Sequence, residues 1–398
     1  MKSATLDKLA PNLVPIEELE ALSRRDRRIL ERGVRGAAVG TGGETIQSIP
    51  VQPFTTDPGL FFQLTSKQVN PIPGIAHPGA GQAFSRQLPQ VGIKSKLRVT
   101  FNGTLTVATA AATTGKDYPY NLLKNFKLSA NGQNDLFNVS GVDLQVLRDL
   151  RYPSFIEGVQ TFPGALYDGN SVAVGSYTLY LSWEVPIAMD DISLVGALFA
   201  QSSSTNLTAQ VTCATNAELF QTNPANVTIT GTWTIEETFF EVPFGDKGEL
   251  IVPDLSRLHG VNGFDTAFTA TGEVTAKLIR SQGQLHRLLV RADHSSTARL
   301  SADPSAASTK KIDAVRLEYG GNKRPYVFNP AASLREVNNQ HYGGPAMYDY
   351  LVFDFARENP ARDAILMQGV TELGAVVTVN SGVTVSAGAL RLVQETLF

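Results

Sequence analysis

Hydrophobic and polar residues alternate in many segments of this chain, which is typical of half-buried β-strands. The run Lys96–Val107 shows the pattern clearly, with Leu97, Val99 and Phe101 separated by polar residues. In the first half we predict strands at 46–54, 96–107, 177–185, 207–213 and 226–241. In the second half we predict them at 273–280, 284–292, 312–319, 348–355, 374–379 and 382–393. The pattern therefore predicts an all-β protein.

Three segments have helical spacing instead. Residues 142–151 are amphipathic and are followed by Pro153, and residues 331–339 form a similar segment in the second half. Residues 15–35 begin with Pro15 and acidic residues and end with arginines, as the helix dipole favours. We therefore predict one N-terminal helix and one short helix in each half of the chain.

A long internal repeat determines the predicted domain organisation. Residues 125–139 and 314–330 both read as a strand, a small-residue turn and a second strand ending in Phe-Asn. Residues 227–240 are echoed by 383–398. A repeat this long is a domain rather than a solenoid turn. Each copy has about eight predicted strands and one helix, which predicts two tandem eight-stranded jelly rolls. The predicted domains are an N-terminal region at 1–43, a first roll at 44–245 and a second roll at 246–398.

Composition supports a turn-rich β protein with buried flanks. Charged residues make up 18% of the chain, against about 25% in ordinary domains, and the net charge is −3. No general attraction to nucleic acid follows from that charge. The single cysteine, Cys213, is expected to be a buried small hydrophobe. With neither an apolar signal region nor a membrane span in view, we expect folding in a cytoplasm.

The N-terminal helix carries the main candidate contact surface. Its candidate contact residues are all arginines: Arg24, Arg25, Arg27, Arg28, Arg32 and Arg35. Four of them recur at near-helical spacing and could meet anionic lipid headgroups, at about 1 kcal/mol per charge. Contact with another subunit, or with solvent, is the alternative. The glycines that follow form a predicted hinge: Gly36, Gly40, Gly42 and Gly43.

The residues that catalysis or metal binding would need are not grouped in the sequence. None of the five histidines shares a His-x-His or His-x-x-x-His spacing with another. The segment Arg291-Ala-Asp-His294 is interpreted as a surface loop. Glu236 and Glu237 point to opposite faces of a strand, so they cannot act as a catalytic pair. We therefore predict no enzyme activity, no metal and no cofactor.

Three segments resemble the double jelly-roll major capsid proteins, and within them the tectivirus type from tailless phages with an internal membrane. Val185–Ala200 resembles the family's segment at a strand end. Val242–Gly245 with Leu250–Leu258 resembles its inter-roll connector, and Asn121–Phe137 resembles its hairpin before the first-roll helix. The resemblance covers most of the chain in architecture and about 50 residues in motifs.

The resemblance implies a structural capsid protein. It implies homotrimers with a pseudo-hexagonal outline, neighbouring capsomers, penton and minor capsid proteins as partners, and an N-terminal helix facing the particle interior or an internal membrane. Assembly in the host cytoplasm into virions is the implied location, without sequence-specific nucleic-acid binding. Two alternatives stay open: a carbohydrate-binding tandem jelly roll and a phage fibre or baseplate protein. The first needs aromatic platforms, whereas Trp183 and Trp233 lie in strands that look like core.

Overall fold

The computed structural model describes residues 54–398, except 133, 152–168, 203–204, 246–247, 279–282, 320–322, 343–348, 356, 358–363, 368–369 and 371–372. The chain divides into two compact units. The smaller comprises Met1–Ser66 and Val242–Asp254, and the larger comprises Lys67–Glu241 and Leu255–Phe398. The three-part division predicted from the sequence stays a prediction.

In the smaller unit, two short strands and one helix are described. Strand β1 (Phe54–Thr56) pairs in parallel with β14 (Leu250–Val252). Helix α4 (Pro58–Leu64) begins after Asp57, whose side chain accepts a hydrogen bond from the Leu60 amide at 2.9 Å. The sequence pattern predicted no helix here, because Asp-Pro-Gly usually marks a turn.

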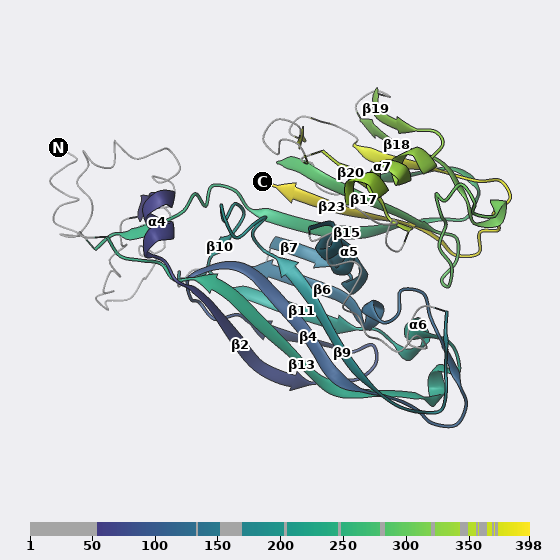
Figure 1. The fold of residues 1–398 in the computed structure, drawn as a ribbon, viewed down its shortest axis with the longest axis horizontal. Coiled ribbons are helices and arrows are strands. Elements are labelled where there is room, and N and C mark those ends of the chain that lie inside the picture. The colour runs from purple at the N-terminus through teal and green to yellow at the C-terminus, as the bar shows by residue number, and fades with distance from the viewer. Residues whose placement is uncertain are drawn as a thin grey trace, which may run out of the picture. The chain divides into compact units, whose positions relative to one another are not determined.

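The larger unit contains two jelly rolls (Figure 1). The strand pairings give both rolls the same strand order. The first roll has sheets β2-β13-β4-β9 and β3-β11-β6-β7. The second has sheets β15-β23-β17-β20 and β16-β22-β18-β19. Taken in chain order, each strand of the second roll occupies the place of its counterpart in the first. The prediction of two eight-stranded jelly rolls is confirmed.

The bounds of the sixteen roll strands follow. The first roll uses β2 (Lys67–Ala76), β3 (Ala83–Gln87), β4 (Ile93–Val107), β6 (Leu123–Ala130), β7 (Asn134–Val139), β9 (Gly175–Pro186), β11 (Leu207–Cys213) and β13 (Val227–Phe240). The second uses β15 (His259–Phe268), β16 (Gly272–Lys277), β17 (Gln284–Asp293), β18 (Ile312–Tyr319), β19 (Lys323–Phe328), β20 (Leu351–Asp354), β22 (Gly374–Val379) and β23 (Gly388–Leu397).

The remaining elements are short. Strands β5 (Ala112–Thr114), β8 (Ser171–Val172) and β12 (Phe220–Thr222) form a small sheet, while β10 (Leu198–Phe199) pairs with β4 and β21 (Ile365–Leu366) with β17. The helices are α5 (Gly141–Arg151), α6 (Asn216–Leu219) and α7 (Ala332–Tyr342), with 3-10 turns η1 (Tyr120–Leu122), η4 (Pro224–Asn226) and η5 (Ser308–Lys310).

One sheet runs through both rolls. Strand β7 of the first roll pairs in parallel with β15 of the second, where Phe137 faces Val261 and Asn138 faces Asn262. The resulting strand order is β20-β17-β23-β15-β7-β6-β11-β3. Because backbone hydrogen bonds cross the junction, the two rolls share a continuous layer.

Each roll has its own hydrophobic core. In the first core Trp183 and Trp233 stack with ring centroids 5.6 Å apart, and Phe101 lies 4.9 Å from Trp233. Cys213 is also buried, as expected. Val261, Leu289 and Val393 belong to the second roll but pack in the first core. Apolar contacts therefore continue across the junction.

The predicted hairpin and helix in each repeat are confirmed as elements. Strands β6 and β7 precede α5, and β18 and β19 precede α7. The second pair of matching segments, 227–240 and 383–398, is less regular. Val227 begins β13, whereas Val383 lies before β23, which begins only at Gly388. The segment Val242–Gly245 with Leu250–Leu258, which resembles an inter-roll connector, contains β14 and directly precedes β15. Its prolines and glycines hid β14, because such residues usually mark loops.

Candidate functional site

The N-terminal residues predicted to make contacts or act as a hinge lie outside the described residues. This applies to Arg24, Arg25, Arg27, Arg28, Arg32 and Arg35 and to Gly36, Gly40, Gly42 and Gly43. Within the part of the chain that the structure describes, no group of three His, Cys, Asp or Glu side chains could hold a metal ion. Polar chemistry is concentrated instead where the two rolls meet.

Helix α5 forms the centre of this contact (Figure 1). It starts with a reciprocal cap: the Asp143 amide donates to Ser140 Oγ at 3.2 Å, and the Ser140 amide donates to Asp143 Oδ2 at 2.8 Å. None of its eleven residues is exposed. A helix covered on all sides is normally apolar, yet this one carries charges at both ends.

At the start of α5, the buried Asp143 carboxylate contacts the second roll. Arg391 donates from Nη2 to Asp143 Oδ2 at 2.5 Å, and the Tyr350 hydroxyl donates to Oδ1 at 2.5 Å. Arg391 also donates to Asp265 at 3.0 Å. Burial alone would raise the pKa of Asp143, but the Arg391 guanidinium and these hydrogen bonds outweigh it and lower that pKa. Asp143 is therefore an anion.

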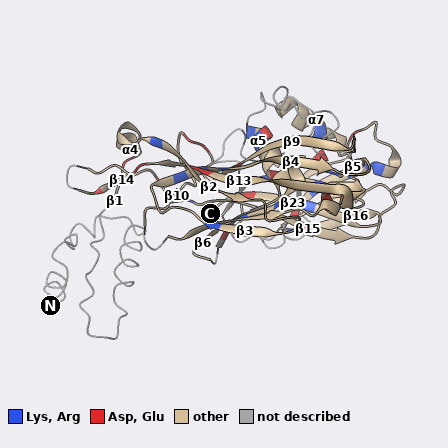
Figure 2. Cartoon of the chain, turned by 90° about the horizontal axis from the view of Figure 1, so that it is seen from below, with Lys and Arg blue, Asp and Glu red and all other residues tan. Residues whose placement is uncertain are grey.

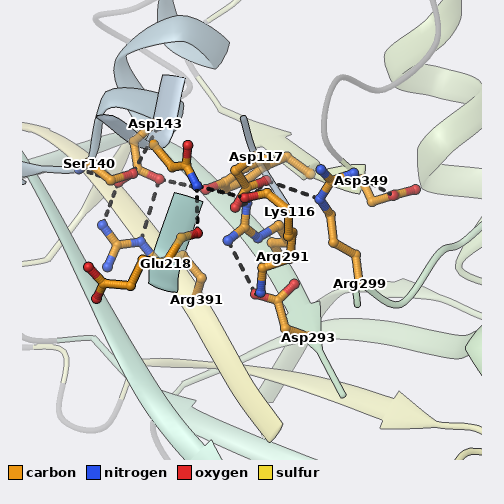
Figure 3. A network of polar contacts seen from close by, with 12 residues as sticks. Lys116, Asp117, Ser140, Asp143, Glu218, Arg291, Asp293, Arg299, Asp349 and Arg391 are labelled. Carbon is orange, nitrogen blue, oxygen red and sulfur yellow. Dashed lines mark hydrogen bonds and ion pairs between the residues drawn. The ribbon is translucent and has the colours of Figure 1, made fainter. Parts of the chain in front are cut away.

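A second group of charges lies beside the first (Figure 3). Arg291 donates to Asp117 at 3.1 Å and to Asp293 at 3.2 Å. Lys116 donates to Asp293 at 2.8 Å, and Arg299 donates to Asp117 at 3.0 Å. Burial lowers the pKa of Arg291, but Tyr350 and the neighbouring carboxylates outweigh it and raise that pKa well above its usual value. Asp117 of the first roll is thus tied to two second-roll arginines, and Lys116 to the second-roll carboxylate of Asp293.

At the end of α5, Arg151 meets a third group centred on Glu395. Arg151 donates to Glu395 Oε1 at 3.1 Å, and Arg287 donates to Oε2 at 3.2 Å. His259 Nε2 lies 3.0 Å from Oε1, and its Nδ1 lies 2.8 Å from the Pro186 carbonyl oxygen. Burial raises the pKa of Glu395, but Arg287 and the other partners outweigh it and hold that pKa well below its usual range.

We call these residues together the inter-roll charge network. It comprises Lys116, Asp117, Asp143 and Arg151 of the first roll and His259, Asp265, Arg287, Arg291, Asp293, Arg299, Tyr350, Arg391 and Glu395 of the second. Buried charges are costly to desolvate, so such a network specifies one geometry more than it adds stability. Its chemistry suits fixing the orientation of two domains.

This network was not predicted from the sequence, and one prediction about it was wrong. The segment Arg291-Ala-Asp-His294 was interpreted as a surface loop, but Arg291 and Asp293 are buried at the end of β17. One feature of the sequence could have indicated the network. The predicted strand at 284–292 places Arg287 and Arg291 on the same face. The carbohydrate-binding alternative needs exposed tryptophans as aromatic platforms. Trp183 and Trp233 are both buried, as predicted.

Comparison with known proteins places the fold. The sequence matches no protein-family model, and no curated protein matches it significantly. Among solved structures, it is similar to the MCP of Sulfolobus turreted icosahedral virus (STIV), with 21% identity and a TM-score of 0.63 over 83% of this chain and 96% of that one. It is also similar to VP54 of PBCV-1, with 14% identity and a TM-score of 0.55 over 84% and 94% of the chains.

Proposed function

We propose that this chain, which has the double jelly-roll fold of the STIV and PBCV-1 capsid proteins, is a tectivirus-like major capsid protein of an icosahedral virus. Its role is structural rather than catalytic. The observation that carries the proposal is the pair of equivalent eight-stranded rolls, joined by one continuous sheet and by the inter-roll charge network. Three such two-lobed blocks, arranged around a threefold axis, give a tile with six lobes and a pseudo-hexagonal outline.

The distribution of charge supports large contacts between copies. Figure 2 shows that Lys, Arg, Asp and Glu are thinly scattered over the strands. Exposed strand positions instead carry many threonines, including Thr228, Thr230 and Thr232 of β13. Threonine is stiff and uncharged, so covering it costs little side-chain entropy and no charge desolvation. Such flanks suit lateral packing over about 1,000 Å² or more.

The oligomeric state tests the proposal. We expect the purified chain to be a stable homotrimer at micromolar concentration, with a mass of 3 × 42.8 = 128.4 kDa by sedimentation. A monomer under those conditions would contradict the proposal, and so would a long fibre, which would favour the fibre or baseplate alternative.

The N-terminal arginines stay part of the proposal. Within the described residues, no helix has the length and apolar character to cross a membrane. We propose that the arginines face the particle interior and meet anionic lipid there, while penton and minor proteins complete a shell assembled in the host cytoplasm. Replacing Arg24, Arg25, Arg28 and Arg32 by Gln should then reduce binding to anionic vesicles at low salt, since screening weakens such contacts. Unchanged binding would instead favour a contact between subunits.

A further inference from the structure

The same row of three charged residues occurs on equivalent strands of the two rolls. In the second roll, Arg287 on β17 lies in register between Glu395 on β23 and Asp354 on β20. We call these three residues the second-roll row. In the first roll, Arg98 on β4 lies in register between Glu236 on β13 and Glu184 on β9. We call these the first-roll row.

The two rows differ in what covers them. The second-roll row lies under α5: the Glu395 side chain is 1% exposed and that of Arg287 20%, and Arg151 donates to Glu395. In the first-roll row the Arg98 side chain is 52% exposed and that of Glu236 33%. An acid–Arg–acid row that one roll buries is therefore more open to solvent on the other, although its third member, Glu184, is only 16% exposed.

The helices that follow the hairpins show the complementary difference. Helix α5 begins three residues after Asn138, and α7 begins three residues after Asn329, so they hold equivalent places. No residue of α5 is exposed, and Asp143 and Arg151 near its two ends pair with the second roll. Five residues of α7 are exposed: Ser333, Glu336, Val337, Gln340 and His341. Only Leu334 and Asn338 of α7 are buried.

We infer that α7 of one copy covers the first-roll row of a second copy, and so repeats between chains the contact that α5 makes within one chain. This rests on the proposed trimer and identifies its interface. A head-to-tail contact of this kind joins two different surfaces and closes into a ring when the rotation fits. With two equivalent rolls per chain, three copies close a ring of six rolls.

The chemistry of the two surfaces is compatible. The sheet face around the first-roll row exposes Thr230 and Thr232, which can bond to the polar side chains Glu336 and Gln340 of α7. Arg357, also exposed, lies beside the end of α7, where it donates to the His341 carbonyl oxygen at 3.4 Å. This guanidinium can serve Glu236 of the next copy as Arg151 serves Glu395.

The contact between copies does not repeat the strand pairing that joins the two rolls within the chain. Strand β2 is the counterpart of β15, which pairs with β7 within the chain. Pro71 and Pro73 of β2 carry no N–H, so a continuous ladder along this edge is blocked. The contact between copies is therefore a helix on a sheet face, without an extended sheet.

Cross-linking tests the geometry directly. When α7 is aligned with α5, and β13 with β23, Asp143 corresponds to Leu334 and Arg391 corresponds to Thr232. Because Asp143 contacts Arg391 within the chain, the exposed Ser333 next to Leu334 should lie near Thr232 of the next copy. The Ser333→Cys/Thr232→Cys chain, treated with a short bismaleimide, should give covalent dimer and trimer bands; native Cys213 is buried and should not react. The control Ser333→Cys/Lys124→Cys uses a 51% exposed side chain on another sheet and should give none.

A charge exchange tests the chemistry. Glu236→Arg should weaken the trimer at least about tenfold, since it sets like charges against Arg357, and adding Arg357→Glu should restore it. The control Glu218→Arg breaks an ion pair that is at least as exposed, with Glu218 42% exposed against 33% for Glu236, and should leave the trimer unchanged. A wild-type trimer without specific cross-links or charge rescue overturns this interface and leaves the proposed function standing. A monomeric wild type overturns both.

Discussion

Replacing Asp143 by Asn should lower the free energy of unfolding by about 3–5 kcal/mol, as measured by chemical denaturation. The side chain keeps its size but loses the charge that compensates Arg391, whose guanidinium would then be buried without its main counter-ion. Tyr350 would also lose a charged acceptor. The control Asp135→Asn removes the charge from a half-exposed pair with Lys127 and should cost less than about 1 kcal/mol.

The pH dependence of the same variant separates lost charge from lost packing. Asp143 has a lowered pKa in the folded protein, so its stabilising contribution is present above the unfolded value of about 3.9 and is lost as pH falls through the folded value. Wild type should therefore lose more stability than Asp143→Asn between about pH 5 and pH 2. Parallel curves for the two proteins would show that the Asp143 charge does not hold the rolls together.

Replacing Gly141 by Val should cost about 3 kcal/mol. A Cβ at this first position of α5 would lie 2.3 Å from the Tyr120 carbonyl oxygen and 2.6 Å from Trp183 Nε1. The first is backbone and the second belongs to a fully buried ring, so neither can move aside cheaply.

The equivalent position of α7 offers a matched control. There the chain already has Ala332, which is half-buried, and Ala332→Val should cost less than about 1 kcal/mol. Equal losses at the two positions would mean that the close packing of α5 against Tyr120 and Trp183 does not set the cost.

The fold could be predicted from sequence because its signals are local. Alternation located β11 at the predicted residues 207–213, and the repeated hairpins located α5 and α7. The inter-roll charge network depends on distant partners: Asp143 and Arg391 are 248 residues apart. A charged residue in a strand normally indicates solvent, and only the tertiary structure shows that Arg291 is buried.

The equivalence of the two charged rows also could not be predicted by aligning the sequences of the two repeat copies. Matching Glu-Thr-Phe-Phe240 with Glu-Thr-Leu-Phe398 sets Glu237 against Glu395. Strand register sets Glu236 against Glu395 instead, since each faces an arginine, Arg98 or Arg287. Glu237 lies on the opposite face, fully buried with Lys94 at 2.6 Å. A shift of one residue exchanges the two faces of a strand, so the row becomes visible only with the pairing known.

Electron microscopy of the purified full-length chain tests the central claim most directly. If the chain is a capsid building block of two equivalent rolls, class averages viewed along the threefold axis should show a compact tile with six lobes, two from each of three copies. Isolated two-lobed particles, or filaments that lengthen with concentration, would contradict the account.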